Sequence, residues 1–368
     1  MSNEPATVPA LPSTPSHGSR IHGCLLGGAL GDTLGSAAEN GDASDGGSHF
    51  SDTTQLTLYT VDGLLETLEW ANDGVAADTT ACLWLAYLRW LATQGVPVPD
   101  AAPFQPPRWI DSHDVLRHRR APESACLTGL ATGEMGTFYR PVNPEAKGSG
   151  AVMRSAPFGL IPYIAADAVY KLSADAASLT HGHPAGRQSA GAFSLVIHAL
   201  AAGHSLREAA EFAARQLAGA AVEGAAVEGA GPDGARLRQD EVVDPDLTAR
   251  LDAALRLGAA GETPGARDLA SELGEGHAAE EALAVALFAV LSTAPEQSPP
   301  GTPEAHFRAA IAVAVGHGGD RGPAASMAGN ILGAFYGEDC LPAEWLAALE
   351  APELVRGMAS RLAAVTGS

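Results

Sequence analysis

GCLLGGALGDTLGSAAE, the stretch from Gly23 to Glu39, decides the fold of this chain, because it joins helix-forming alanines and leucines to closely repeated glycines. A glycine inside an exposed helix costs roughly 0.5–1 kcal/mol relative to alanine. That cost is offset where the helix backbone must lie close to another helix. We therefore predict a helix over residues 20–38 that packs against a second helix. The glycines concerned are Gly23, Gly27, Gly28, Gly31 and Gly35.

The rest of the chain is typical of an all-α protein. Hydrophobic residues make up 46% of the 368 residues but aromatic residues only 5%, so the core must consist mainly of alanine, leucine and valine. This composition and the helical spacing of apolar residues favour helices over strands. We predict a single compact domain of orthogonal helices over residues 20–368, after a disordered tail over residues 1–19. Further helices are predicted over residues 52–68, 79–93, 174–180, 185–201, 206–218, 248–257, 279–291, 303–315, 324–336 and 353–364.

The charge balance excludes several classes of partner. The 22 basic and 43 acidic residues give a net charge of −21, and such a surface repels nucleic-acid phosphate and anionic lipid. We expect no nonspecific nucleic-acid binding and no membrane binding. The N-terminal residues lack the apolar core of a secretory signal, and no apolar run has membrane-spanning length. We therefore expect a cytoplasmic monomer.

Six segments, in the same order, resemble the blocks of the ADP-ribosylglycohydrolase family, of the dinitrogenase-reductase-activating glycohydrolase type. The resemblance covers roughly Ile21 to Leu349. It implies a helical fold that binds ADP-ribose in a cleft, holds two magnesium ions there, and hydrolyses the bond between the ribose anomeric carbon and an ADP-ribosylated acceptor. The segments are GCLLGGALGDTLGSAAE, SDTTQLTLYTVDGL, KGSGAVMRSAPFGL, LTHGHPAGRQSAG, GEGHAAEEAL and HGGDRGPAASMAGNILGAFYG.

The first metal motif that the resemblance implies is incomplete. The family pattern has a hydroxyl residue followed by two aspartates, whereas this chain has Ser51, Asp52 and then Thr53. Magnesium prefers a shell of carboxylate, hydroxyl and water oxygens. Taken alone, Ser51 and Asp52 are explained by capping of the following helix, which needs no ligand.

The second metal motif is incomplete as well. The family pattern is Asp-x-Asp followed by Ser or Thr, whereas Asp320 is followed here by Arg321, Gly322 and Pro323. Two of four motif carboxylates are missing, and an unpaired Arg321 would repel a nearby cation by roughly a few kcal/mol. Alternatively, the Arg321 guanidinium replaces the charge of the metal. We expect no two-metal site, and at most one weakly bound magnesium ion. Its ligands would come from Ser51, Asp52, Thr53 and Asp320.

The resemblance also implies a catalytic set. Glu39 stands where the family has a glutamate near the scissile bond, and a carboxylate there can position water or act as a general base. Asp52 would position the same water, and Asp320 would orient the ribose. The alternative for Glu39 is a solvated glutamate at a helix end.

The ligand-binding residues implied by the resemblance lie in two other segments. Lys147, Gly148, Ser149 and Gly150 resemble the loop that holds the diphosphate, since closely spaced glycines let backbone N–H groups turn toward an anion. His181 is the expected histidine contact to ADP-ribose, whereas the neighbouring His183 is equally well explained by capping or core packing. Without the other blocks, the glycines would be explained by an ordinary loop.

Three functions remain open at this level. The first is an ADP-ribosyl hydrolase that cleaves an N- or O-glycosidic bond with reduced or altered metal dependence. The second is a catalytically inactive relative that binds ADP-ribose or a related nucleotide, and the third is a protein whose pocket accepts a different glycosyl compound. We favour the hydrolase, because hydrolysis is the usual task of the family. The sequence does not identify the acceptor.

Overall fold

The structure, a computed structural model, describes residues 14–40, 49–223, 242–260, 266–294 and 301–368. Helix α1 (His17–Asn40) begins before the predicted boundary at residue 20. The start is fixed by tertiary contacts, since His17 Nε2 lies 2.9 Å from the carbonyl oxygen of Leu160. Residues 1–13 of the predicted tail lie outside the described residues.

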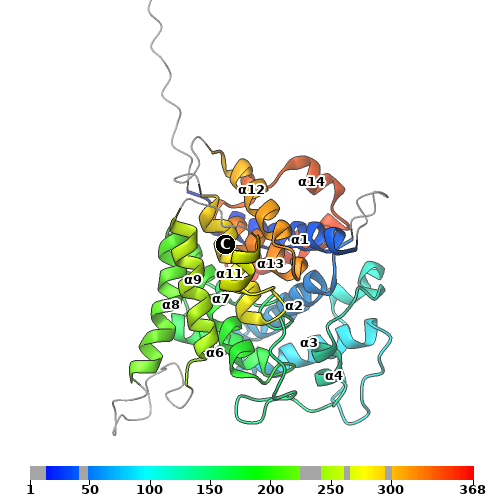
Figure 1. Ribbon diagram of the computed structural model, residues 1–368. Coiled ribbons are helices and arrows are strands. Elements are labelled where there is room, and N and C mark those ends of the chain that lie inside the picture. Colours follow the sequence, from blue (N-terminus) through cyan, green and yellow to red (C-terminus); the bar gives the residue numbers. More distant parts are fainter. Residues whose placement is uncertain (1–13, 41–48, 224–241, 261–265, 295–300) are drawn as a thin grey trace, which may run out of the picture.

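Helix α1 lies antiparallel to α13 (Arg321–Tyr336), and the two backbones are in contact (Figure 1). A Cβ added at the glycines of this contact would overlap backbone atoms of the opposite helix. The close helix–helix approach predicted from the glycine-rich stretch is therefore present. It brings the C-terminal end of α1 beside the N-terminal end of α13. The glycines are Gly23, Gly27, Gly31 and Gly35 in α1, and Gly329 and Gly333 in α13.

The other helices follow the predicted order. They are α2 (Asp52–Asn72), α3 (Thr79–Thr93), α4 (Ser124–Leu130), α5 (Ala156–Gly159), α6 (Ala166–Ala177), α7 (Pro184–Ala201), α8 (Leu206–Glu223), α9 (Pro245–Ala259), α10 (Ala266–Leu273), α11 (Ala279–Ser292), α12 (Pro303–Gly316), α14 (Ala343–Ala348) and α15 (Pro352–Val365), with 3-10 turns η1 (Trp109–Ser112), η2 (Asp114–Arg117) and η3 (Glu338–Cys340).

Most predicted helix positions agree with the structure, and the differences have local reasons. Helix α3 has the predicted bounds, whereas α6 begins at Ala166 rather than at residue 174. Its first turns are partly exposed and carry polar residues such as Lys171, which pairs with Asp175 one turn later at 2.7 Å. Helices α4, α5, α10 and α14 were not predicted, because none exceeds eight residues and short apolar segments carry little periodicity.

Helices α7 and α11 form the centre of the molecule. Almost all of their residues are buried, including small ones that allow close contact with neighbouring helices. Helices α8 and α9 cover them on one side (Figure 1), while α13 contacts both. Helix α2 is also buried from Asp52 to Leu65, so its N-terminus lies inside the protein. A buried helix N-terminus needs acceptors for its free N–H groups.

The prediction of a single all-α domain is confirmed. No strand occurs in the part of the chain that the structure describes, where the β-type pairing is one isolated bridge between Gly148 and Ala278. Among the described helices, none combines the length and the apolar character required to cross a lipid bilayer.

Candidate active site

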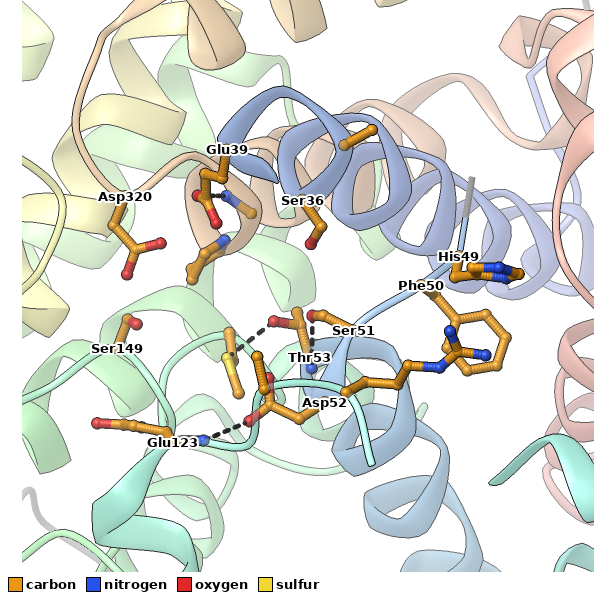
Figure 2. Close-up of a pocket in the computed structure, with 16 residues that line it drawn as sticks. Ser36, Glu39, His49, Phe50, Ser51, Asp52, Thr53, Glu123, Ser149 and Asp320 are labelled. Atoms are coloured by element: carbon orange, nitrogen blue, oxygen red, sulfur yellow. Dashed lines mark hydrogen bonds between the residues drawn. The ribbon is translucent and has the colours of Figure 1, made fainter. Parts of the chain in front are cut away.

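A cavity of about 420 Å³ lies where the end of α1 meets the beginnings of α2 and α13. Figure 2 shows Glu39 and Asp320 on one side of it and Asp52 and Glu123 on the other. Three of these four carboxylates belong to the predicted catalytic set, and the structure brings all three to one cavity. The described lining residues are Ser36, Ala37, Glu39, His49, Phe50, Ser51, Asp52, Thr53, Arg120, Ala121, Glu123, Ser149, Met153, Asp320, Gly322 and Pro323.

The N-terminus of α2 is capped by Ser51 and held by a buried aspartate of α1. Ser51 Oγ accepts the backbone N–H of Thr53 at 3.1 Å, which is the capping role expected for this residue in the absence of a ligand. Asp32 accepts the N–H and hydroxyl of Ser51 at 2.8 and 2.5 Å and those of Thr54 at 3.1 and 2.6 Å. Burial raises the pKa of Asp32, and these hydrogen bonds oppose the rise. Asp32 therefore fixes the entry of α2 against α1.

Asp52, the first residue of α2, is a buried carboxyl at the edge of the cavity. Its Oδ2 accepts the backbone N–H of Glu123 at 3.0 Å. Burial, together with the charges of Asp32, Glu123 and Asp320, raises the pKa of Asp52 to about 8, although the Glu123 N–H acts in the opposite direction. The carboxyl is thus poised to carry a proton near neutral pH unless a cation is present.

The N-terminus of α13 is capped by a residue of another helix. Glu39 Oε1 accepts the backbone N–H groups of Arg321 and Gly322, the second at 2.9 Å, and a carboxylate in this position also interacts favourably with the helix dipole. Asp320 precedes α13 but its side chain makes no capping bond. Pro323 lacks an N–H group, which is tolerated in the first turn of a helix.

Asp320 is a half-buried carboxyl that lies near the carboxylates of Glu39 and Glu123. Burial, together with the neighbouring Glu39 and Glu123 carboxylates, raises the pKa of Asp320 to about 7. Arg321 does not offset this negative charge inside the cavity. Its Nη1 donates instead to the carbonyl oxygen of Ala38 at 3.0 Å, at the C-terminal end of α1, and Arg321 is not among the lining residues. We considered that the Arg321 guanidinium either repels a metal cation or replaces its charge. Because the guanidinium is directed at Ala38 and does not line the cavity, neither interaction occurs there.

The predicted diphosphate loop surrounds the carboxylate of Glu123. A Cβ added at Gly148 or Gly150 would overlap this carboxylate, and the nearby Gly150 N–H acts to lower the pKa of Glu123. Ser149 lines the cavity. Lys147 turns away, with its Nζ 3.4 Å from the buried Glu280.

His181 contacts Glu123 and not the cavity. The imidazole is fully buried, and its Nε2 lies 3.1 Å from both Glu123 oxygens. Thr180 Oγ1 accepts from Arg154 Nη2 at 2.8 Å and lies 2.8 Å from His181 Nδ1. Because the Thr180 hydroxyl can then donate to Nδ1, the proton of a neutral His181 is assigned to Nε2, directed at Glu123. His183 caps α7 by accepting the N–H of Ala185 at 3.1 Å.

A second group of metal-type side chains lies behind the cavity but does not suit a cation. Glu123, Cys126 and His181 place ligand atoms within 4.8 Å of one another. Burial, however, raises the pKa of the Cys126 thiol well above its usual range, and Arg154 Nη1 lies 3.6 Å from its sulfur. A guanidinium in this position already supplies the positive charge that a metal would bring.

Sequence reasoning missed two residues of the site. Asp32 lies within the glycine-rich helix, among small residues. A buried aspartate requires hydrogen-bond donors, so its position in the sequence could have indicated a structural role beside the site. Glu123 lies in the segment RRAPESACLTGL, and its link to the glycine loop depends on contacts across the fold that no local pattern reveals.

The donors that remain fit one hard cation better than two. Asp52 and Asp320 are carboxyls whose pKa values are raised by burial, so a cation bound beside either one would relieve an unfavourable charge. The other motif positions contribute little. Thr53 Oγ1 donates to Met153 Sδ at 3.1 Å, Gly322 has no side chain, and Ser51 Oγ already donates to Asp32.

The fold and the site together define a class, namely an all-α protein with an acidic cleft at the N-termini of two buried helices. The chain belongs to the ADP-ribosylglycohydrolase family, whose model matches residues 13–368. It is 27% identical to ADP-ribosylhydrolase ARH3 of Danio rerio over 387 aligned residues, covering 94% of this chain and 90% of the relative. It is 25% identical to ADP-ribosylhydrolase ARH3 of Homo sapiens over 367 residues, covering 91% and 90%.

The fold is also similar to a solved structure. A chain of an "ADP-ribosylglycohydrolase-related protein complex" superimposes with a TM-score of 0.61 and 20% identity, covering 95% of this chain and 99% of the other. At this identity, the similarity supports the fold alone.

Proposed function

We propose that this protein is an ADP-ribosyl hydrolase that cleaves the glycosidic bond between ADP-ribose and an acceptor, with reduced dependence on metal. The observation that carries the proposal is the convergence of Glu39, Asp52 and Asp320, from the ends of three helices, on one cavity. Membership of the ADP-ribosylglycohydrolase family and the similarity to two ADP-ribosylhydrolases support it.

The proposed reaction adds water across the glycosidic bond. The bond from the ribose anomeric carbon to the acceptor breaks, a bond to the water oxygen forms, and a proton passes to the departing acceptor. Positive charge develops on the ribose in such reactions, and an acidic cleft stabilises it. Glu39 accepts the proton of the water, Asp52 supplies a proton to the acceptor, and Asp320 orients the ribose hydroxyls.

Protonation of Asp52 and binding of a cation are alternative ways to neutralise the same buried charge. A magnesium ion would be held by Asp52 and Asp320 with the Ser51 hydroxyl nearby, and it would offset carboxylate charge and orient the ligand when bound. Because two motif carboxylates are absent, we propose weak binding of one ion. The raised pKa of Asp52 provides the reason that hydrolysis persists without it.

One observation favours the binding-protein alternative. Glu39 Oε1 already accepts the backbone N–H groups of Arg321 and Gly322 at the start of α13, so this oxygen is engaged in capping. A Glu39 fixed in this role would leave the cleft able to bind ADP-ribose without turning over substrate.

The test is release of ADP-ribose from a mono-ADP-ribosylated protein and from ADP-ribosyl small molecules, in magnesium and in chelator. We expect turnover in both, with Asp320→Asn reducing the rate at least ~10-fold. Glu134→Gln, an exposed glutamate outside the cavity, is the matched control. Binding of ADP-ribose with no release from any substrate would favour the binding protein.

A further inference from the structure

The glycine loop and His181 form an anion-binding cradle, and a side chain of the protein already occupies it. The donor in contact is His181 Nε2, with the Gly150 N–H nearby, and the occupant is the Glu123 carboxylate, whose two oxygens each lie 3.1 Å from Nε2. Because Gly148 and Gly150 lack side chains, the Glu123 carboxylate can lie directly against the loop backbone. The arrangement places a fixed negative charge where the loop could receive a phosphate.

The surroundings show that the cradle selects for an anion. Burial raises the pKa of Glu123, but His181, Arg154 and the Gly150 N–H outweigh burial and hold the pKa below its usual value. Asp52, which accepts one backbone N–H from Glu123, and Asp320 face the same cavity, and burial raises both of their pKa values. His181 therefore provides an N–H donor at the position that the Glu123 carboxylate occupies.

The rest of the cavity offers an incoming phosphate little compensation. Arg120 is the one arginine among the described lining residues, and its Nη2 is paired with Glu350 at 2.7 Å. His49 Nδ1 lies 2.9 Å from the same Glu350 oxygen. A diphosphate therefore depends on the donors that Glu123 holds.

We propose that Glu123 is a specificity-determining residue, which competes with a ligand phosphate for the Gly150 N–H and the His181 imidazole. A diphosphate ligand binds only after the Glu123 side chain leaves the cradle, whereas a ligand without phosphate meets no such competitor. The cleft thus discriminates against phosphate-bearing ligands at this position. The inference rests on the proposed function, since ADP-ribose is the diphosphate ligand considered.

The side chain can leave while its backbone stays in place. The Glu123 backbone N–H donates to Asp52, and this bond does not involve the carboxylate. The side chain is 28% exposed, so the occupied cradle is open to solvent on one side. Displacement is therefore a side-chain rotation and needs no opening of the fold.

The experiment compares the wild type with Glu123→Gln by calorimetry, using ADP-ribose and adenosine as probes. Glutamine keeps the size of the side chain and an oxygen that accepts from His181, but it removes the competing charge. We expect Glu123→Gln to lower the Kd of ADP-ribose about 10-fold or more, since a like charge a few ångströms away opposes binding strongly. Adenosine, which has no phosphate, should bind equally to both proteins.

Two further variants serve as controls, one for the loss of a negative charge and one for the loss of the Glu123 side chain. Glu134→Gln removes the same charge from an exposed position and should leave the Kd of ADP-ribose unchanged. Glu123→Ala should tighten ADP-ribose binding as Glu123→Gln does, provided that its thermal unfolding matches that of the wild type.

An unchanged or weaker affinity for ADP-ribose in Glu123→Gln would overturn the inference, as would no binding of ADP-ribose by any variant. These results are separable from the proposed function. Turnover by the wild type, with an unchanged affinity for ADP-ribose in Glu123→Gln, would support the proposed hydrolase and contradict the competitor role of Glu123. Tighter binding of ADP-ribose in Glu123→Gln without turnover by any variant would support the competitor role of Glu123 and contradict the proposed hydrolase.

Discussion

Glu39 Oε1 accepts the backbone N–H of Gly322 at 2.9 Å, so the last turn of α1 caps the first turn of α13. This contact links the glycine-rich helix pair to the cleft, because the same close approach that aligns the two backbones places Glu39 at the cavity. Capping and the proposed catalytic role therefore meet in one carboxylate, and a substitution there can separate them.

Glu39→Gln should reduce hydrolysis far more than stability. Glutamine retains an oxygen that accepts the α13 N–H groups but cannot take a proton from water, so we expect a loss of kcat of about 100-fold or more. The loss of negative charge at the helix N-terminus should lower stability by about 1 kcal/mol or less. Steady-state kinetics and urea unfolding measure the two effects. A variant with the kcat of the wild type and reduced stability would show that Glu39 only caps α13.

Gly31→Ala should destabilise the fold strongly, although alanine is the better helix former. A Cβ at this position would overlap backbone atoms of Ala325, which cannot yield without separating α1 from α13. We expect a loss of about 2 kcal/mol or more. Gly219→Ala is the matched control, because Gly219 is an exposed residue of α8 with no atom near its added Cβ, and this change should stabilise by up to about 1 kcal/mol. Equal effects of the two substitutions would contradict the close helix contact.

Asp52→Asn should remove part of the pH dependence of stability when chelator is present. The pKa of Asp52 is about 8 in the folded protein, against an ordinary value of 3.8. The folded state therefore binds a proton that the unfolded state releases, and this contribution to stability is greatest at low pH and is lost as pH rises toward 8. One such proton gives a slope of at most about 1.4 kcal/mol per pH unit.

The check is the free energy of unfolding at pH 5.5 and pH 8.5. The wild type should lose stability across this interval, Asp52→Asn should lose less, and the exposed Asp100→Asn should follow the wild type. Asp320, with a pKa of about 7, acts in the same direction and leaves a residual slope in Asp52→Asn. The same slope in Asp52→Asn and the wild type would exclude Asp52 as its source.

The helical fold was predictable because its main determinants are local. Glycine spacing between Gly23 and Gly35 indicated a close helix pair, and apolar periodicity located α3 with its bounds. The partner of the glycine-rich helix could not be named from sequence, since the contact with α13 joins opposite ends of the chain.

The candidate site was only partly predictable for the same reason. Motif positions identified Asp52 and Asp320, but side-chain direction depends on neighbours supplied by the fold. Arg321 turns to the carbonyl oxygen of Ala38, and His181 turns to Glu123. The arginine therefore does not oppose a cation in the cavity.

Because Arg321 is directed away from the cavity, we expect Thr53→Asp together with Gly322→Asp to restore magnesium binding, whereas Arg321→Ser alone should not. A Cβ at Gly322 would lie 3.3 Å from Ser36 Oγ and 3.9 Å from Glu39 Oε1, so an aspartate there points into the cavity. The added carboxylates increase repulsion in the metal-free protein, and magnesium should raise the Tm of the double variant by several degrees. Each single substitution should do little, because both half-sites supply one shared shell. Pro323 still lacks a hydroxyl group, which limits the recovery. We would measure thermal unfolding and hydrolysis, each with magnesium and with chelator. An equal response to magnesium in the wild type would show that the missing carboxylates do not weaken the metal site.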